Sequence, residues 1–325
     1  MVINVPTTSH DSHRRSHPPE RDRVLIFWNP KAGAGLGEAR VQRLAALLRM
    51  RHCDAEIISQ IDQLVQRAAE CRQSGCLRAI VAAGGDGTVA LVANETPLGT
   101  PISVLPLGTE NLLSKYLGLT ASPDDVCMTI CDGARVQLDA GEVNGRIFLL
   151  MAGCGFDADV VRRLHLQRQG NIHHLAYAKP ILDSIRNYEY PELRVYCEDD
   201  SGDWAEPVTA RWAFVVNLPR YAGGLQIVPD ALGDDGLLDV CTFREGSFWN
   251  GIRYLGGVLL GQHQSFRDCR TVRSRRLKIE SDASVPFQLD GDPGGTLPVE
   301  IRVLPQRMTI LAPAAWSGQR VRTAS

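Results

Sequence analysis

The chain has 325 residues and a mass of 35.6 kDa, about twice an average domain of ~150 residues, so we expect two domains. Its 35 Lys and Arg and 37 Asp and Glu give a formal net charge of −2, and 44% of residues are hydrophobic. This composition excludes a largely disordered chain and a nucleic-acid binder that relies on overall positive charge. No apolar stretch approaches the ~18 residues that a membrane-spanning helix needs.

The two ends of the chain and its cysteines indicate where the protein resides. Residues 1–22 are polar and lack the apolar core of a secretory signal, so we expect a disordered tail there and a second tail at residues 313–325. The nine cysteines are scattered, odd in number and form no Cys-x-x-Cys pair. They predict reduced thiols in a cytoplasmic protein and argue against a zinc site.

Strand-like and helix-like segments alternate through the first part of the chain. Short apolar runs end in loops that contain glycine or proline, and apolar residues at helical spacing follow each loop. The predicted strands are residues 24–28, 55–59, 78–83 and 102–106. Such alternation is typical of parallel strands with helices on the sheet faces, so we expect an α/β domain over residues 23–134.

The pattern changes after about residue 135. Asn144-Gly145 separates two strand-like runs, which is a strong hairpin signal. Further strand-like runs follow at residues 193–197, 212–217, 237–243, 277–280 and 285–289. They predict an antiparallel β-domain over residues 135–297, interrupted by helices near 173–187 and 247–261. Strand-like residues 299–304 and 308–311 follow, and the pattern does not tell which domain they join.

The most informative segment is Gly84-Gly85-Asp86-Gly87-Thr88, between a predicted strand and a predicted helix. Glycines let backbone N–H groups approach a phosphate without obstruction by Cβ, and the helix N-terminus adds partial positive charge. Thr88 is a candidate cap for that helix. The segment therefore indicates a phosphate site, with a tight strand-to-helix turn as the alternative.

Two more loops follow neighbouring predicted strands at the same end, Asn29-Pro30-Lys31-Ala32-Gly33 and Leu107-Gly108-Thr109-Glu110-Asn111. Ligands of open α/β sheets bind beyond the carboxyl ends of the strands, so three such loops would converge on one crevice. Either loop alone is equally compatible with an ordinary connection. The spacing of Gly33, Gly35 and Gly37 does not fit a dinucleotide-binding fingerprint, and a P-loop Gly-Lys-Ser/Thr is absent from the sequence.

In combination, these motifs resemble the diacylglycerol kinase catalytic-domain family, which includes bacterial lipid kinases and is related to sphingosine and ceramide kinases. The stretches that carry the resemblance are residues 29–33, 84–88, 105–111 and 229–239, with Asp290-Gly291-Asp292 beyond them. The resemblance covers about residues 23–312. It implies an α/β nucleotide-binding domain of the NAD kinase/diacylglycerol kinase type and an antiparallel β-sandwich domain. It also implies ATP and Mg²⁺ between the domains, and a return of residues 298–312 to the first domain.

The resemblance also implies roles for individual residues. The implied nucleotide-binding residues are Asn29, Pro30, Gly33, Gly84, Gly85, Gly87, Thr88, Gly108, Thr109 and Asn111. Asp86 would act near the phosphates, as a base or through a magnesium-bound water. Asp235, with the backbone carbonyls of Leu232 and Leu237, would form a structural magnesium site, for which a plain β-turn is the alternative. Asp292 stands where the family often has the glutamate of Asp-Gly-Glu, a general base, and a hairpin turn is its alternative.

Phosphoryl transfer needs bound phosphates, a metal that neutralises charge and a carboxylate that accepts the proton of the acceptor hydroxyl. We therefore predict a cytoplasmic, ATP- and magnesium-dependent kinase whose acceptor is a lipid hydroxyl, on diacylglycerol or a related lipid. A kinase of a soluble acceptor that resembles NAD kinase is one alternative. A non-catalytic lipid or nucleotide sensor is the other.

One segment suggests contact with a membrane surface. Apolar residues recur at helical spacing and basic residues follow them: Phe248, Trp249, Ile252, Leu255, Val258 and Leu259, then Arg267, Arg270, Arg273, Arg275, Arg276 and Lys278. An amphipathic surface beside basic residues is suited to anionic lipid. An ordinary core helix followed by a solvated strand is the alternative. The expected partners are thus a lipid substrate and a peripheral membrane surface, with no nucleic acid, and a homodimer is compatible with the sequence.

Overall fold

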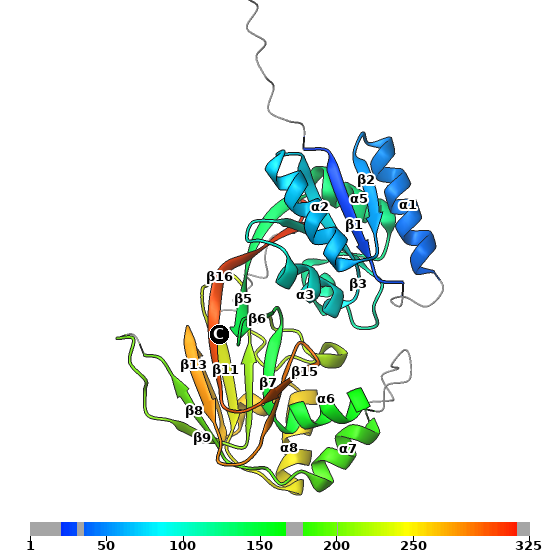
Figure 1. The fold of residues 1–325 in the computed structure, drawn as a ribbon. Coiled ribbons are helices and arrows are strands. Elements are labelled where there is room, and N and C mark those ends of the chain that lie inside the picture. The colour runs from blue at the N-terminus through cyan, green and yellow to red at the C-terminus, as the bar shows by residue number, and fades with distance from the viewer. Residues whose placement is uncertain (1–20, 31–35, 167–177, 200, 317–325) are drawn as a thin grey trace, which may run out of the picture.

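The computed structural model describes residues 21–30, 36–166, 178–199 and 201–316. Figure 1 shows an α/β domain above a β-rich domain, with two long strands, β5 (Ala134–Val143) and β16 (Val299–Ala312), running between them. This arrangement confirms the predicted fold class of an α/β domain plus an antiparallel β-sandwich. No helix in the described ranges is long and apolar enough to cross a membrane.

The α/β domain is built on a parallel sheet with strand order β2-β1-β3-β4. Its strands and helices are β1 (Arg23–Trp28), α1 (Gly37–Met50), β2 (Asp54–Ile58), α2 (Ile61–Gln73), β3 (Leu77–Gly84), α3 (Asp86–Glu95), β4 (Pro101–Pro106), α4 (Leu112–Leu117) and α5 (Pro123–Asp132). Alternate residues of β1 enter different cores: Leu25 packs with α2 and α3, and Val24 packs with α1 and α5. Both faces of the sheet are therefore covered, and the residues of its central strands are mostly apolar.

The β-domain pairs an antiparallel six-stranded sheet, in the order β12-β11-β10-β7-β14-β15, with a second layer that contains β9, β8, β13, β16, β5 and β6. The remaining bounds are β6 (Arg146–Phe148), β7 (Met151–Gly155), α6 (Phe156–Leu166), α7 (Ala178–Asn187), β8 (Leu193–Cys197), β9 (Val208–Ala210), β10 (Trp212–Val216), β11 (Leu238–Phe243), α8 (Phe248–Leu259), β12 (Cys269–Ser274), β13 (Arg276–Glu280), β14 (Pro286–Leu289) and β15 (Asp292–Thr296), with short 3₁₀ helices at Ala222–Gly224 and His263–Ser265.

The central strands of the six-stranded sheet, β7, β10 and β11, are buried on both faces. On β10, Ala213 and Val215 point into the sandwich core, whereas Trp212 and Phe214 point to the opposite face and join a core with Phe156 of α6. Figure 1 shows α6, α7 and α8 gathered beside this sheet. The helices thus form a third layer, and the space between them and β10 is where an interior cavity lies.

The last strand belongs to both domains. The sequence pattern predicts two strands, at residues 299–304 and 308–311, but the structure has one 14-residue strand, β16, with a register shift against β5 between Leu304 and Met308. Its first half pairs antiparallel with β13 in the β-domain, and its second half pairs parallel with β4 through Thr309 and Ile310. The second half of β16 therefore extends the α/β sheet by one strand.

Candidate active site

Two glycine loops of the α/β domain pack against each other by their backbones. A Cβ on Gly108 would lie 2.5 Å from the Cα of Gly85, and a Cβ on Gly84 would lie 2.1 Å from Oγ1 of Thr88. The N–H of Leu107 donates a 2.9 Å hydrogen bond to the carbonyl of Gly84. A Cβ at Gly108 would therefore block the contact between the two loops, and a Cβ at Gly84 would collide with Thr88 in its own turn. Gly87, by contrast, is exposed and keeps the start of α3 open.

Asp86 links the two loops. Its Oδ2 accepts the N–H of Leu112 at 2.8 Å and its Oδ1 accepts the N–H of Leu113 at 3.0 Å, so the carboxylate caps the N-terminus of α4. Burial raises the pKa of Asp86, and the two N–H groups act in the opposite direction. The structure thus gives Asp86 a structural task, and its role toward phosphates or metal stays a prediction.

The remaining predicted nucleotide residues lie around these loops. Asn111 closes its own loop, because its Oδ1 accepts the N–H of Gly108 at 3.0 Å and its Nδ2 donates to the Gly108 carbonyl at 2.7 Å. Thr109 is exposed, as are Asn29 and Pro30 after β1, the sheet neighbour of β3. Gly33 lies outside the described residues.

The cap of α3 differs from the sequence prediction. Gly85 occupies the N-cap position, and no side chain caps the helix. Thr88 lies half-buried within the first turn, where its Oγ1 is close to Gly84. The first N–H groups of α3 are therefore left for another acceptor, such as a phosphate oxygen.

A tight turn from the β-domain faces these loops. Asp290 (φ 51°) and Gly291 (φ 87°) both have left-handed backbone conformations. These two residues form the turn that joins β14 to β15 in a short hairpin. The buried carboxylate of Asp290 accepts the N–H groups of Leu149, Leu150 and Met151 at 2.6, 2.8 and 3.0 Å. Burial outweighs these hydrogen bonds and raises the pKa of Asp290 to about 6. The turn is therefore fixed to the β-domain by its first residue.

Asp292, at the start of β15, is the residue that approaches the glycine loops. A Cβ built on Gly87 would lie 4.0 Å from Oδ2 of Asp292, so the carboxylate stands opposite the first turn of α3. Its side chain is 45% exposed, and Nη2 of Arg146 lies 3.5 Å away. Unlike Asp86, Asp292 has a carboxylate that is accessible to a substrate. The structure thus brings the two predicted catalytic carboxylates to one place, from two domains.

The predicted magnesium residues lie in a turn before β11. Oδ1 of Asp235 accepts the N–H of Leu237 at 3.0 Å, and the N–H of Gly236 donates to Oδ2 of the buried Asp139 at 2.7 Å. Burial raises the pKa of Asp235, and the negative charges of Asp139 and Asp234 add to that effect. These oxygen donors fit Mg²⁺ by chemistry. In the described part of the chain, no three His, Cys, Asp or Glu side chains are grouped for a metal, so the carbonyls of Leu232 and Leu237 would have to complete the site.

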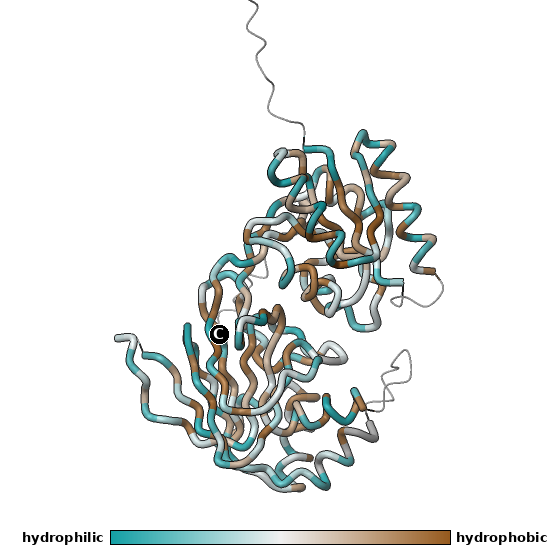
Figure 2. The backbone as a smooth tube through the Cα atoms, in the orientation of Figure 1, coloured by the Kyte–Doolittle hydropathy of each residue, from teal (hydrophilic) through white to brown (hydrophobic). Residues whose placement is uncertain are grey.

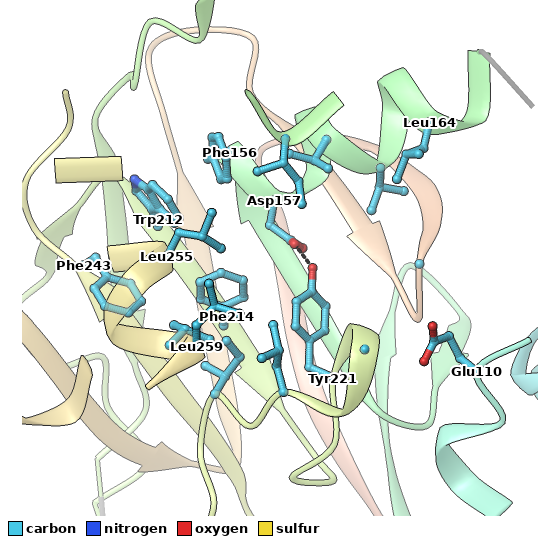
Figure 3. Close-up of a pocket in the computed structure, with 18 of the residues that line it drawn as sticks. Glu110, Phe156, Asp157, Leu164, Trp212, Phe214, Tyr221, Phe243, Leu255 and Leu259 are labelled. Carbon is cyan, nitrogen blue, oxygen red and sulfur yellow. Dashed lines mark hydrogen bonds between the residues drawn. The ribbon is translucent and has the colours of Figure 1, made fainter. Parts of the chain in front are cut away.

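An apolar cavity of about 370 Å³ opens beside the turn (Figure 3). Its walls come from α6, α7, β10, the segment before residue 228, β11 and α8. Residues that line it include Phe156, Val160, Val161, Leu164, Ile181, Trp212, Phe214, Leu225, Ile227, Phe243, Leu255, Val258 and Leu259. Glu110 from the second glycine loop and Gly291 from the turn line the same cavity. The cavity therefore extends from the interior of the β-domain to the loops that hold the candidate catalytic residues.

One polar chain connects the cavity wall to the turn. Tyr221 donates its hydroxyl hydrogen to Asp157, as Figure 3 shows, and Nε2 of Gln288 donates to Oδ2 of Asp157 at 2.9 Å. Oε1 of Gln288 in turn accepts the N–H of Gly291 at 2.7 Å. Burial raises the pKa of Asp157, while the two donors act to lower it. This chain holds the turn from the side of the cavity.

Known proteins match the chain over nearly its whole described length. Residues 23–143 match the diacylglycerol kinase catalytic domain, and residues 151–312 match the YegS C-terminal NAD kinase beta sandwich-like domain. The chain belongs to the diacylglycerol kinase catalytic-domain family. The family resemblance predicted from the sequence motifs is thereby confirmed.

Individual relatives agree with this assignment. The chain is 25% identical over 301 residues to a diacylglycerol kinase of Bacillus subtilis, which covers 90% of this chain and 96% of that protein. It is 28% identical over 303 residues to a Pseudomonas aeruginosa protein named "Probable lipid kinase YegS-like", which covers 91% and 96%. A crystal structure of a diacylglycerol kinase from Bacillus anthracis superposes with a TM-score of 0.68 and 24% identity, over 90% of this chain and 98% of that one. The sequence relatives therefore agree with the assignment to this kinase family, and the crystal structure agrees with the fold.

Sequence reasoning missed Asp157, Tyr221, Gln288 and the cavity itself. A signal for Asp157 was present, because it and Asp159 are carboxylates within the otherwise apolar run of residues 151–161, where buried charges need partners. The cavity residues gave no such signal, since their side chains are of the same types as those of the core.

Proposed function

We propose that the protein is an ATP- and magnesium-dependent kinase that transfers the γ-phosphate of ATP to the hydroxyl of diacylglycerol or a related lipid. The observation that carries this proposal is the cavity. Its lining along α6, β10 and α8 is mostly apolar, with Asp157 and His165 as the polar residues of α6, and it ends at Glu110 and Gly291 beside the glycine loops. Its volume is in the usual range for small-molecule sites of roughly 300 to 1,000 Å³.

The polarity of the cavity favours a lipid over a soluble acceptor. Apolar walls bind hydrocarbon at roughly 25 cal/mol per Å² of surface removed from water, whereas a polar acceptor would lose its hydration there. An acyl chain between α6 and α8 would leave the polar end of the lipid near Gly291. The acceptor hydroxyl would then lie near Asp292.

The roles proposed for the residues at the polar end of the cavity follow from the exposure and the hydrogen bonds of those residues. The uncapped first turn of α3 and the exposed Gly87 are suited to hold phosphates. Asp292 would accept the proton of the lipid hydroxyl. The oxygen of that hydroxyl would form the new bond to the γ-phosphorus of ATP as the bond to the β-phosphate breaks and ADP leaves. Asp86, whose oxygens already accept two backbone N–H groups, would support this step by fixing both loops.

Magnesium would enter this proposal at two places. With the nucleotide, the ion would neutralise phosphate charge. At the turn before β11, Asp235 and the carbonyls of Leu232 and Leu237 would hold a structural ion. Asp235→Ala should then weaken the rise in melting temperature that magnesium produces without nucleotide. Asp199 also accepts N–H groups of its own exposed turn, so Asp199→Ala is a matched control that should keep the full response. An equal response in both variants would leave Asp235 as a turn residue.

The experiment that tests the proposed function is incubation with γ-labelled ATP, magnesium, NAD and a total lipid extract, followed by organic extraction. We expect label in the organic phase, and chromatography of that phase would identify the acceptor lipid. Label confined to aqueous NADP would instead support a soluble-acceptor kinase. ATP binding without transfer to any acceptor would support a sensor.

A further inference from the structure

Helix α8 has large apolar side chains on its outer face as well as on the inner face that packs against the protein. Five large apolar side chains at 248–260 are exposed, with exposed fractions of 38% for Phe248, 77% for Trp249, 41% for Ile252, 61% for Leu259 and 72% for Leu260. The charged residue of this helix, Arg253, forms an ion pair with Asp268 and lies over the ring of Phe266. A helix with this pattern normally has apolar surroundings on both sides.

The exposed side of α8 adjoins the cavity. Leu255 and Val258 line the cavity from the inner side of the helix, and Leu259 both lines the cavity and is 61% exposed. Leu166, at the end of α6, the opposite wall, is 80% exposed. Figure 2 shows apolar colouring along parts of this helical layer of the β-domain. The apolar interior and the apolar exterior therefore meet at one rim.

We propose that the outer face of α8, formed by Phe248, Trp249, Ile252, Leu259 and Leu260, docks into the interface of a lipid bilayer. This inference rests on the proposed lipid kinase function. A two-chain lipid has negligible solubility in water, so its path into the cavity must begin in a bilayer. A rim that continues the apolar wall out to the surface lets the acyl chains move without exposure to water.

The basic residues beyond α8 contribute less than the sequence suggests. Three of the six are already paired: Arg273 with Asp239 at 3.2 Å, Arg276 with Glu300 at 2.6 Å and Lys278 with Glu280 at 2.6 Å. The other three, Arg267, Arg270 and Arg275, are exposed and form no ion pair with the described residues. Docking should therefore depend mainly on apolar insertion, with a smaller contribution from anionic lipid that salt screens.

The first test measures binding to vesicles. The double variant Trp249→Ser/Leu260→Ser removes two outward side chains that do not line the cavity. Met50→Ser/Leu98→Ser is the matched control, because Met50 is 77% and Leu98 61% exposed in the α/β domain. In sedimentation with vesicles of phosphatidylcholine and 20% phosphatidylserine, we expect the α8 variant to lose affinity by roughly ten- to a hundredfold and the control to bind as wild type. Equal loss in both variants, or in neither, would overturn the proposal.

The second test separates docking from catalysis. With a monomeric short-chain diacylglycerol, the α8 variant should phosphorylate as fast as wild type. With long-chain diacylglycerol in vesicles, it should be slower by about the factor by which binding falls. Wild type that binds vesicles through α8 but phosphorylates neither substrate would support docking while removing the proposed function. Equal rates on vesicles would overturn docking.

The third test addresses a second copy of this chain as the occupant of the face. Sedimentation velocity over a range of concentrations should give the same mass for wild type and the α8 variant. A dimer that the variant abolishes, with vesicle binding unchanged, would assign the face to self-association and overturn the proposal.

Discussion

The glycine loops and the cavity are suited to different ligands, phosphate and hydrocarbon, and only the loops can be recognised from the sequence. The loops present backbone N–H groups, so they need glycines at Gly84 and Gly108, where a Cβ would collide with neighbouring atoms, while Gly87 keeps the start of α3 exposed. The cavity presents hydrocarbon, so it needs ordinary core residues arranged around a space. A site for phosphate therefore leaves a residue pattern in the sequence, whereas a site for an acyl chain consists of a space that only the fold defines.

Replacement of Asp292 should have the largest effect, because it removes the carboxylate that faces the loops. Asp292→Asn keeps the size of the side chain but not its proton affinity, so we expect turnover to fall by roughly 10² to 10⁴ with little change in melting temperature. Steady-state kinetics with nucleotide titration would check this. Asp292→Glu should retain more activity. Normal turnover in Asp292→Asn together with an inactive Asp86→Asn would instead make Asp86 the base.

Partial filling of the cavity should weaken the binding of the lipid and leave the binding of the nucleotide unchanged. Val161→Trp places a large ring in the space beside α6, so we expect the KM for long-chain diacylglycerol to rise by on the order of tenfold or more, with the KM for ATP unchanged. Leu36→Trp, at an exposed position of the α/β domain, is the control for an added tryptophan. Equal KM values for lipid in both variants would mean that the acyl chain lies elsewhere.

Asp86→Asn should separate structural support from chemistry within the loops. An asparagine has one acceptor oxygen where Asp86 uses two, so one N–H of α4 loses its partner and the free energy of unfolding should fall by about 1–3 kcal/mol. Chemical denaturation would measure it. Asp62→Asn, an exposed aspartate in the first turn of α2, is the control and should be nearly neutral. Unchanged stability in Asp86→Asn would show that the cap is dispensable.

The turn that carries Asp292 should show a smaller, pH-dependent effect through Asp290. The pKa of Asp290 is raised to about 6, above the usual aspartate value, so its contribution to stability is present at low pH and is lost as pH rises through 6. The stability difference between wild type and Asp290→Asn should therefore be about 1 kcal/mol more favourable to wild type at pH 5 than at pH 7. Urea titrations at both values would test it. A difference that grows with pH would mean that the three N–H donors outweigh burial.

The sequence predicted the parts of this molecule that depend on local pattern. The alternation around β1 to β4, the Asn144-Gly145 hairpin and the glycine segments fix local geometry through a few residues each, and the strands and turns formed where expected. The continuous strand β16 was not predicted, because Pro305 and Gln306 read as an interruption and pairing with β4 is a long-range property. The hydrogen-bonded series Tyr221–Asp157–Gln288 also could not be predicted from local sequence pattern. Asp157 lies 64 residues from Tyr221 and 131 residues from Gln288 in the sequence.

The shared strand β16 has a consequence for how the protein is made. The partner of β4 consists of residues 309 and 310, more than 200 residues later in the chain. During synthesis the α/β domain leaves the ribosome with an uncovered sheet edge at β4, and it completes its sheet only when the β-domain and the last strand have been translated. The sheet of the α/β domain is therefore complete only after β16 has been translated. Truncation before residue 299 would leave the β4 edge open to pairing with other chains.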